Sequence, residues 1–283
     1  MKPVDSSRPL VLISWNGQHP PLQSIHVDTS PQFDLLIFDY SGQGSCQATP
    51  LDLCIQGREL PVIMVSVATE CKGQIFQWLA QYLQQQSCQP QYLGLIDDDI
   101  LLSFSSINRL LHIGRQQALD VFSPSLTHDS FFSHRWMLQR GQRHSRPVPW
   151  VEVMMPFYNT EVFMQAAPLF QGFVTSWGFD QYLFPTVQKI MGRQNSAIID
   201  AVAATHHRPI TSQHKKYSSG MNGKEEHQAV KALCMALIAR EHPELRGTAW
   251  YRQTFERKYF ESPARRAWQA LGRPLRKWLD QSL

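Results

Sequence analysis

Three consecutive carboxylates, Asp97, Asp98 and Asp99, are the side chains of this chain with the clearest chemical potential. They directly follow a strand-forming run, Tyr-Leu-Gly-Leu-Ile, at residues 92–96. Adjacent carboxylates repel one another and resist desolvation, so a strand seldom ends in three of them unless a cation neutralises their charge. Oxygen ligands suit hard divalent ions such as Mg²⁺ or Mn²⁺, which also bind phosphate oxygens. The cluster indicates either a metal–diphosphate site or a helix N-terminus, where Asp favours the positive end of the helix dipole.

Short apolar runs alternate with amphipathic helical patterns around this cluster. Buried strands are predicted at residues 9–14, 34–39, 61–67, 92–96 and 118–122, and helices at 72–86 and 105–117. This alternation predicts an α/β sandwich with a largely parallel central sheet. Open sheets of this kind bind ligands outside the carboxyl ends of their strands, which is where the triplet falls.

The second half of the chain is less regular. Residues 123–149, rich in His, Arg, Ser and aromatic residues, are predicted to form a long loop over the carboxyl edge of the sheet. A strand is expected at 150–156, then a helix capped by Asn159 and running towards residue 170. A further helix should follow Trp177-Gly178, with a last strand at 197–201 and a helix at 223–240.

Composition narrows the class of protein. Of 283 residues 43% are hydrophobic and 18% charged, as in an ordinary globular protein. The net charge of +4 arises from a basic excess after Arg252, so the main domain is not basic enough to suggest a nucleic-acid binder. Five cysteines without CxxC spacing favour reduced thiols in the cytosol over a disulfide framework or a zinc site. No apolar run reaches membrane-spanning length and the start lacks a signal-peptide core, so a cytoplasmic protein is expected.

Several segments together resemble one family. In order they are FDLLIFDYSG, YLGLIDDDI, WVEVMMPFYNTEVF, SWGFDQYLF and AIIDAVAATHHRP. Their order resembles the domain-of-unknown-function family numbered 707, whose members resemble GT-A nucleotide-sugar glycosyltransferases, over roughly residues 9–212. The resemblance implies metal-dependent transfer of a sugar from a nucleotide diphosphate, UDP by default, to a saccharide or lipid-linked acceptor in surface polysaccharide synthesis. It also implies a GT-A-like catalytic domain at 1–215, with a helical extension at 216–283.

The resemblance assigns the metal site. Asp97 and Asp99 stand where GT-A folds carry their Asp-x-Asp motif, and in an extended segment their side chains would share a face. Asp99 is expected to bind Mn²⁺ or Mg²⁺ directly, Asp97 to bind the metal or the donor ribose, and Asp98 to bind the ribose or cap the next helix. His206 matches a histidine that often supplies the third ligand, although the neighbouring His207 leaves the choice between the two open.

A second element, Trp-Gly-Phe-Asp, resembles the acceptor side of inverting GT-A enzymes. Asp180 would be the base that takes the proton from the acceptor hydroxyl, or it could merely cap the following helix. Trp177 would offer the acceptor sugar a flat apolar face. Gly178 would permit close approach of the backbone.

Further candidates are less specific. Glu152 interrupts an apolar stretch, so it should face a cleft and bind acceptor, or pair with an arginine. Lys72 could approach the donor diphosphate or be solvated, and Trp15 could shape the nucleotide pocket. Four arginines of the 123–149 loop could neutralise phosphate or be surface charge: Arg135, Arg140, Arg143 and Arg146.

Two matters stay open. The basic and aromatic tail at 251–283 is either an amphipathic helix on an anionic membrane, at its inner face, or a pair of helices packed on the catalytic domain. The rival functions are a binding or scaffold protein without turnover and a metal-dependent phosphohydrolase that uses the same carboxylates.

Overall fold

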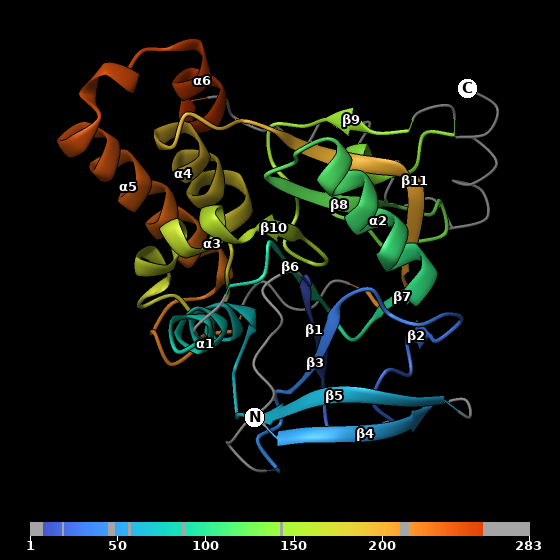
Figure 1. Cartoon of the computed structure of the whole chain (residues 1–283). Helices are drawn as coiled ribbons and strands as arrows, with labels where there is room; N and C mark the ends of the chain where they lie inside the picture. Colours follow the sequence, from blue (N-terminus) through green and yellow to red (C-terminus); the bar gives the residue numbers. More distant parts are fainter. Residues whose placement is uncertain are drawn as a thin grey trace.

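The computed structural model describes residues 8–18, 20–44, 49–55, 58–86, 89–141, 144–209 and 215–256, with the backbone alone at 49–55 and 58–59. A mixed, mostly parallel β-sheet forms its centre, as the alternating pattern predicts (Figure 1). Parallel pairs join β6 to β1, β1 to β3 and β3 to β5. The bounds of these strands are Leu10–Trp15 (β1), Asp34–Asp39 (β3), Arg58–Ser66 (β5) and Tyr92–Ile96 (β6).

On the other side of β6, the short strand β10 runs antiparallel between β6 and β8, and β8 pairs in parallel with β11. These strands are Phe157–Asn159 (β10), Val121–Leu126 (β8) and Ser196–His206 (β11). Since β8 and β6 both oppose β10, β11 runs in the same direction as β6. The end of β11 therefore reaches the same edge of the sheet as the carboxylate triplet. The remaining strands are Ile25–His26 (β2), Thr49–Ile55 (β4), Ile100–Ser103 (β7) and Arg146–Pro147 (β9).

Helices cover the sheet, and three of them, α1, α2 and α5, occupy ranges close to those predicted from the sequence. In Figure 1, α1, α3, α4 and α5 gather on one side, and α2 lies over β8 and β11. Helix α2 packs closely on β8, since a Cβ on its Gly114 would lie 2.3 Å from the ring of Phe122. The bounds are Lys72–Gln84 (α1), Phe104–Gln116 (α2), Thr160–Ala166 (α3), Phe184–Ile190 (α4), Gly223–Glu241 (α5) and Ala249–Tyr251 (α6). Shorter turns are Arg135–Met137 (η1), Ala167–Phe170 (η2), the π-helix Phe179–Leu183 (η3), Pro243–Leu245 (η4) and Arg252–Glu256 (η5).

An aromatic core fastens these helices to one another. Phe76 of α1 is fully buried, and ring centroids of five other aromatic residues lie 5.5–6.0 Å from its own, in edge-on, tilted or stacked arrangements. The five are Tyr158, Phe163, Phe170, Phe179 and Phe184. Because Phe179 opens η3, the element that carries Asp180 is fixed to the helix that carries Lys72.

Local signals explain where helices begin. Ser103 caps α2 by accepting from the backbone N–H of Ser106, and Asn159 caps α3 as expected, by accepting from Glu161. Helix α5 starts with a reciprocal capping box between Asn222 and Glu225.

Two sequence expectations are wrong. Residues 150–156 form turns rather than a strand; they lie between Pro149 and Pro156, and proline cannot donate to a sheet ladder. The position next to β6 is taken by β10, and the irregular segment only contributes the carbonyls of Met154 and Pro156 to the end of β6. The loop expected from residue 123 begins later, because β8 continues to Leu126 with all six residues buried.

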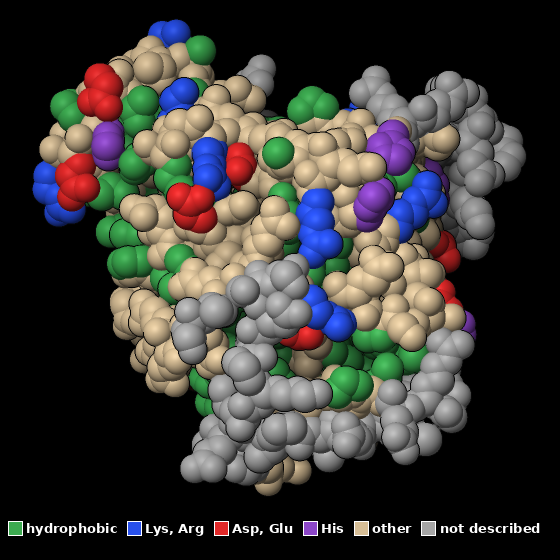
Figure 2. Space-filling view, in the orientation of Figure 1, with side chains coloured by type: hydrophobic (Ala, Val, Ile, Leu, Met, Phe, Trp, Pro, Cys, Tyr) green, Lys and Arg blue, Asp and Glu red, His purple; other side chains and the backbone are tan. Residues whose placement is uncertain are grey.

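The extension after residue 215 packs on the rest of the chain as far as it is described. Val230, Cys234 and Ile238 of α5 belong to the common core, and Phe255 stacks on Tyr182. Residues 257–283, most of the proposed membrane-binding tail, lie outside the described residues. None of the described helices is both long and apolar enough to cross a membrane. On the face shown in Figure 2, acidic and basic side chains are interspersed.

Candidate functional site

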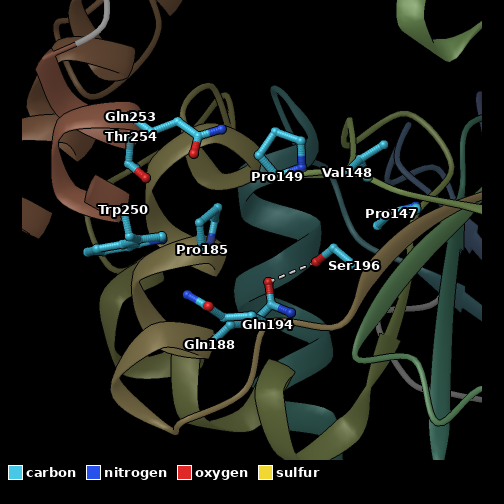
Figure 3. Close-up of a pocket in the computed structure, with 10 residues that line it drawn as sticks. All are labelled: Pro147, Val148, Pro149, Pro185, Gln188, Gln194, Ser196, Trp250, Gln253 and Thr254. Carbon is cyan, nitrogen blue, oxygen red and sulfur yellow. Dashed lines mark hydrogen bonds between the residues drawn. The ribbon is translucent and has the colours of Figure 1, made fainter. Parts of the chain in front are cut away.

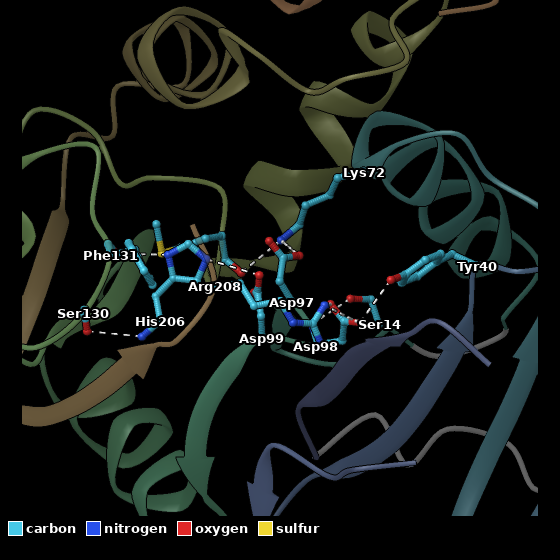
Figure 4. Close-up of polar contacts among 11 residues, drawn as sticks. Ser14, Tyr40, Lys72, Asp97, Asp98, Asp99, Ser130, Phe131, His206 and Arg208 are labelled. Carbon is cyan, nitrogen blue, oxygen red and sulfur yellow. Dashed lines mark hydrogen bonds and ion pairs between the residues drawn. The ribbon is translucent and has the colours of Figure 1, made fainter. Parts of the chain in front are cut away.

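Asp97, Asp98 and Asp99 form a turn between β6 and β7. The backbone N–H of Ile100 donates to the carbonyl of Asp97 at 3.2 Å, which closes the turn. The segment is therefore not extended, and the expected shared face of the first and third side chains does not exist. Instead, each carboxylate turns towards a different partner (Figure 4).

Asp97 meets Lys72. The Nζ atom of Lys72 lies 2.6 Å from Asp97 Oδ1 and also donates to the carbonyl of Met154 at 3.1 Å. Burial and the neighbouring carboxylates raise the pKa of Asp97 to about 6, although the charge of Lys72 acts in the opposite direction. In this arrangement Lys72 neutralises the triplet rather than standing free for a donor diphosphate.

Asp98 lies among residues that the sequence did not single out. The hydroxyl of Tyr40 donates to Asp98 Oδ2 at 3.0 Å, and Arg208 Nη1 approaches the same oxygen at 3.4 Å. The backbone N–H of Asp98 donates to Ser14 Oγ at 3.1 Å. Burial and the charge of Asp98 raise the pKa of Tyr40 beyond its ordinary range. Asp98 is thus held by groups from β1, from the end of β3 and from the segment after β11, and it does not cap a helix.

Asp99 faces His206, the last residue of β11. His206 Nε2 lies 3.2 Å from Asp99 Oδ2, and Nδ1 lies 2.9 Å from the carbonyl oxygen of Phe131. A carbonyl oxygen only accepts, so Nδ1 must carry a proton there. Nε2 then faces a carboxylate, which requires either a second ring proton or a cation between the two atoms. Burial opposes both shifts, but the contact between the two groups raises the pKa of His206 and lowers that of Asp99.

This pair suits a divalent cation. Adjacent ligands of an octahedral ion with bonds of ~2.1 Å are about 3.0 Å apart, close to the observed separation of Asp99 and His206. An imidazole with a carboxylate is a donor set that Mn²⁺ accepts readily. Among the described residues, however, no three His, Cys, Asp or Glu side chains gather to hold a metal ion. The expected set of Asp97, Asp99 and His206 is therefore not assembled, because Asp97 is drawn to Lys72. The His206 imidazole meets the triplet, and the neighbouring His207 donates its backbone N–H to the carbonyl of Asp99 at 3.1 Å.

Asp180 and Glu152 form a second group of acids. Both side chains are buried, each with 9% exposure. Burial, followed by the charge of Glu152, raises the pKa of Asp180 to about 8, although the backbone N–H of Gln181 donates to its Oδ1 at 2.8 Å. The hydroxyl of Tyr158 is buried nearby, has no hydrogen-bond partner within the described part of the chain, and has its pKa raised by burial and then by the charges of Asp180 and Asp97. Glu152 thus lies near another acid, Asp180.

The loop before Asp180 is held by helix α5. Glu226, fully buried, accepts from the backbone N–H groups of Val174 and Thr175 and from the hydroxyls of Thr175 and Ser219. Charge-assisted hydrogen bonds of this number fix the loop firmly. No local pattern predicts this role, since Glu226 lies on an otherwise ordinary helix.

Trp177 and Gly178 also pack against α5. A Cβ on Gly223 would lie 2.9 Å from the Trp177 indole, so one side of that ring is covered, and Trp177 is half-buried. Gly178 has a φ of +90° and faces Val230, so its backbone conformation and packing both require glycine. The backbone of Gly178 approaches helix α5 closely, whereas the sequence predicted that it would approach a sugar.

The ends of β1, β3 and β5 carry a further acid. Trp15, Asp39 and Ser66 stand opposite one another in register, and Asp39 is buried. Ser41 and Ser66 donate to its two carboxylate oxygens. An acid that ends a buried strand is the same signal that marks Asp97, so Asp39 could have been found from the sequence. Trp15 is half-buried at this edge, and its neighbour Ser14 makes the contact with the triplet.

Arg146, expected to bind phosphate or lie at the surface, does neither. It is buried and its Nε lies 2.8 Å from Asp200 Oδ2. Arg143 lies outside the described residues.

The fold is α/β with a mixed, mostly parallel sheet and is GT-A-like, since two solved structures resemble it over most of this chain. Residues 1–349 of S. aureus TarS, in complex with UDP-GlcNAc, match with a TM-score of 0.54 and 9% identity, over 82% of this chain and 67% of that one. GalNAc-T7 with UDP, GalNAc and Mn²⁺ matches with a TM-score of 0.51 and 9% identity, over 88% of this chain and 55% of that one. The chain thus spans about two thirds of the first and about half of the second. No family model matches the chain, and no curated protein matches its sequence.

Proposed function

We propose that this chain is a metal-dependent glycosyltransferase that moves a sugar from a nucleotide diphosphate, by default UDP, to a saccharide or lipid-linked acceptor in surface polysaccharide synthesis. Its GT-A fold supports this, as do the ligands of two structures with that fold, UDP-GlcNAc in TarS and UDP, GalNAc and Mn²⁺ in GalNAc-T7. The acidic turn lies at the carboxyl edge of the sheet, where open α/β folds bind their ligands.

The observation that carries the proposal is the contact between Asp99 and His206. A neutral imidazole that donates through Nδ1 has a lone pair on Nε2, and this lone pair would face the carboxylate at 3.2 Å. A divalent cation would relieve that repulsion, so we assign Asp99 and His206 as metal ligands, with Asp97 as a third if Lys72 releases it. Bound there, Mn²⁺ or Mg²⁺ would neutralise the charge that builds on the departing diphosphate.

The chain's own groups would complete the reaction. Arg208 and Lys72 flank the turn with positive charge that can meet diphosphate oxygens. Tyr40 and Asp98, joined by a hydrogen bond of 3.0 Å, would contact the nucleotide. With a pKa of about 8, Asp180 would be a base matched to a mildly alkaline pH, able to take the proton from an acceptor hydroxyl. Trp177 would present its uncovered side to the acceptor, with Glu152 and Gly178 beside it.

The test is thermal unfolding of the full chain with UDP, GDP and ADP, each with and without Mn²⁺. A ligand that binds only the native state raises the unfolding temperature. We expect one of the diphosphates to raise the unfolding temperature only when Mn²⁺ is present, and we expect this effect to disappear in Asp99→Asn. Glu161→Gln, which changes an exposed acid, should behave as the wild type. A retained Mn²⁺-dependent shift in Asp99→Asn would reject the metal assignment.

One observation favours a second candidate, a nucleotide-sugar-binding protein that needs no metal. Lys72 already neutralises Asp97 at 2.6 Å, and Arg208 supplies another cation beside the turn. In that case the same experiment would give a nucleotide shift that is equal with and without Mn²⁺ and is lost in Lys72→Met.

A further inference from the structure

A pocket of about 330 Å³ lies far from the acidic turn (Figure 3). Its walls come from α4, from the start of β11, from the segment around β9 and from α6 with η5. Ser196, the first residue of β11, lines it, whereas His206, the last residue of that strand, meets the triplet. The register of β11 with β8 slips between Ile199 and Ala203, so residues 196–204 span only the length of Val121–Leu126, roughly 17 Å at ~3.3 Å per residue, and two further residues lead to His206. The pocket is therefore a separate feature, and its volume is within the ~300–1,000 Å³ typical of small-molecule sites.

The lining is polar, aromatic and uncharged. Trp250 forms one wall and is half-buried. Three side-chain amides, two hydroxyls and three prolines account for most of the rest, and none of the ten lining residues is ionisable. A phosphate or carboxylate would find no cation among these residues, and Lys189 is engaged with the Trp250 ring, 5.9 Å from its centroid.

Gln188, on the floor of the pocket, points to the kind of ligand. The side chain is only 3% exposed, and its Oε1 accepts from Ser196 Oγ at 3.1 Å. Its Nε2 is buried and has no hydrogen-bond partner within the described part of the chain. Buried donors are normally paired, so a ligand oxygen that accepts from Nε2 would remove this deficit.

We propose that this pocket binds a neutral sugar unit. A pyranose ring has an apolar C–H face that can pack on the Trp250 indole. Its hydroxyls both donate and accept, which matches the carboxamides of Gln188, Gln194 and Gln253. A purely apolar ligand would leave these amides unpaired, and a nucleotide would bring phosphate charge into an uncharged pocket.

The sugar unit would belong to a glycan chain that runs over the surface towards Gln181. A smaller hollow of about 10 Å³, with room for about one water molecule, shares four lining residues with the pocket and continues its lining to Trp150, Gln181 and Tyr182. Gln181 directly follows Asp180, so a bound chain would lead towards the acid assigned to the acceptor. That the chain is the acceptor rests on the proposed function; that it binds does not.

The binding test uses the full chain and isothermal titration calorimetry with four neutral hexasaccharides: malto-, cello-, laminari- and chitohexaose. We expect at least one of them to bind. Trp250→Ala removes the aromatic wall and should reduce the affinity at least about tenfold, which is the loss expected when an aromatic contact and its buried area are removed. The exposed Gln253→Ala should weaken the same ligand with little risk to folding. Trp78→Ala, at a half-buried tryptophan of α1 outside the pocket, is the matched control and should keep the wild-type affinity.

Binding of none of the four sugars at millimolar concentration would overturn the inference. So would an affinity that both pocket variants leave unchanged, or one that Trp78→Ala weakens equally. The nucleotide thermal shift measured on Trp250→Ala separates the two proposals, because it should remain at the wild-type value whether or not the pocket binds sugar.

Discussion

Lys72 Nζ lies 2.6 Å from Asp97 Oδ1, so the first residue of α1 is tied to the first residue after β6. The side chain of Lys72 is 12% exposed and that of Asp97 is 31% exposed, so water screens the pair in part. Lys72→Met keeps the apolar stem but removes the charge, and Asp97 then lacks its counter-ion. We expect the free energy of unfolding in urea to fall by about 1–3 kcal/mol.

The control is a double-mutant cycle with Asp97→Asn. If the two charges stabilise one another, the double variant should be more stable than the sum of single effects predicts, by at least about 1 kcal/mol. Additive effects would show that the ion pair contributes nothing to stability.

Gly73, the next residue of α1, packs against the loop that precedes Asp180. Its N–H donates to the carbonyl of Val174 at 2.8 Å, and a Cβ would lie 2.6 Å from that same oxygen. A backbone oxygen held by this bond cannot give way cheaply, so Gly73→Ala should lower the free energy of unfolding by about 1–3 kcal/mol.

Gly141→Ala is the matched control for Gly73→Ala, because nothing lies within 4 Å of a Cβ at that position. Its effect on urea unfolding should stay within about 0.5 kcal/mol. Equal losses for both variants would mean that crowding at Val174 is not the cause.

His206 and His207 are adjacent in sequence but differently placed, and this gives a test of the metal ligand. The His206 imidazole lies 3.2 Å from Asp99, whereas the backbone N–H of His207 donates to the Asp99 carbonyl. His206→Gln should weaken Mn²⁺ binding, measured by calorimetry, at least about tenfold, since even second-shell partners of a metal contribute that much. His207→Gln should bind Mn²⁺ like the wild type; the opposite ranking would move the ligand to His207.

Much of the fold and part of the site could be predicted from the sequence. Helices α1 and α2 show a clear apolar stripe, and strands such as β1 and β6 are short apolar runs, so local periodicity suffices to find them. The position of His206 near the triplet also follows, because strands that run the same way end at one edge of a sheet. The strand predicted at 150–156 is wrong because apolar content alone does not distinguish a strand from a buried irregular segment, and this segment follows Pro149 and ends at Pro156.

The partners of the triplet could not be predicted, because they depend on which strands become neighbours. Ser14, Tyr40 and Arg208 come from three separate parts of the chain and meet only at Asp98. Likewise, the clamp of Glu226 on the loop at Val174 requires the position of α5, which no local pattern contains. Register and helix packing are tertiary properties, whereas the acids themselves are visible in the sequence.

Asp180 should reveal its raised pKa in the pH dependence of stability. Its pKa is about 8 in the folded protein against an ordinary value of 3.8, so between these values the folded state holds a proton that the unfolded state releases. Stability from this group is therefore lost as the pH rises towards 8. The Asn side chain of Asp180→Asn cannot lose a proton. The free energy of unfolding of this variant, relative to that of the wild type, should therefore increase by at least about 1 kcal/mol between pH 5.5 and 7.5.

Asp39→Asn is the control, because the pKa of Asp39 is shifted in the opposite direction to that of Asp180. Although burial opposes it, hydrogen bonds from Ser41 and Ser66 lower the pKa of Asp39, so this group is ionised in both states throughout that range. Its variant should differ from the wild type by a constant amount. If Asp180→Asn is equally flat, Asp180 is ionised at neutral pH. If its stability instead shows the predicted slope, transferase activity in the wild type should rise with pH through about 8, as expected of a base that must first lose its proton.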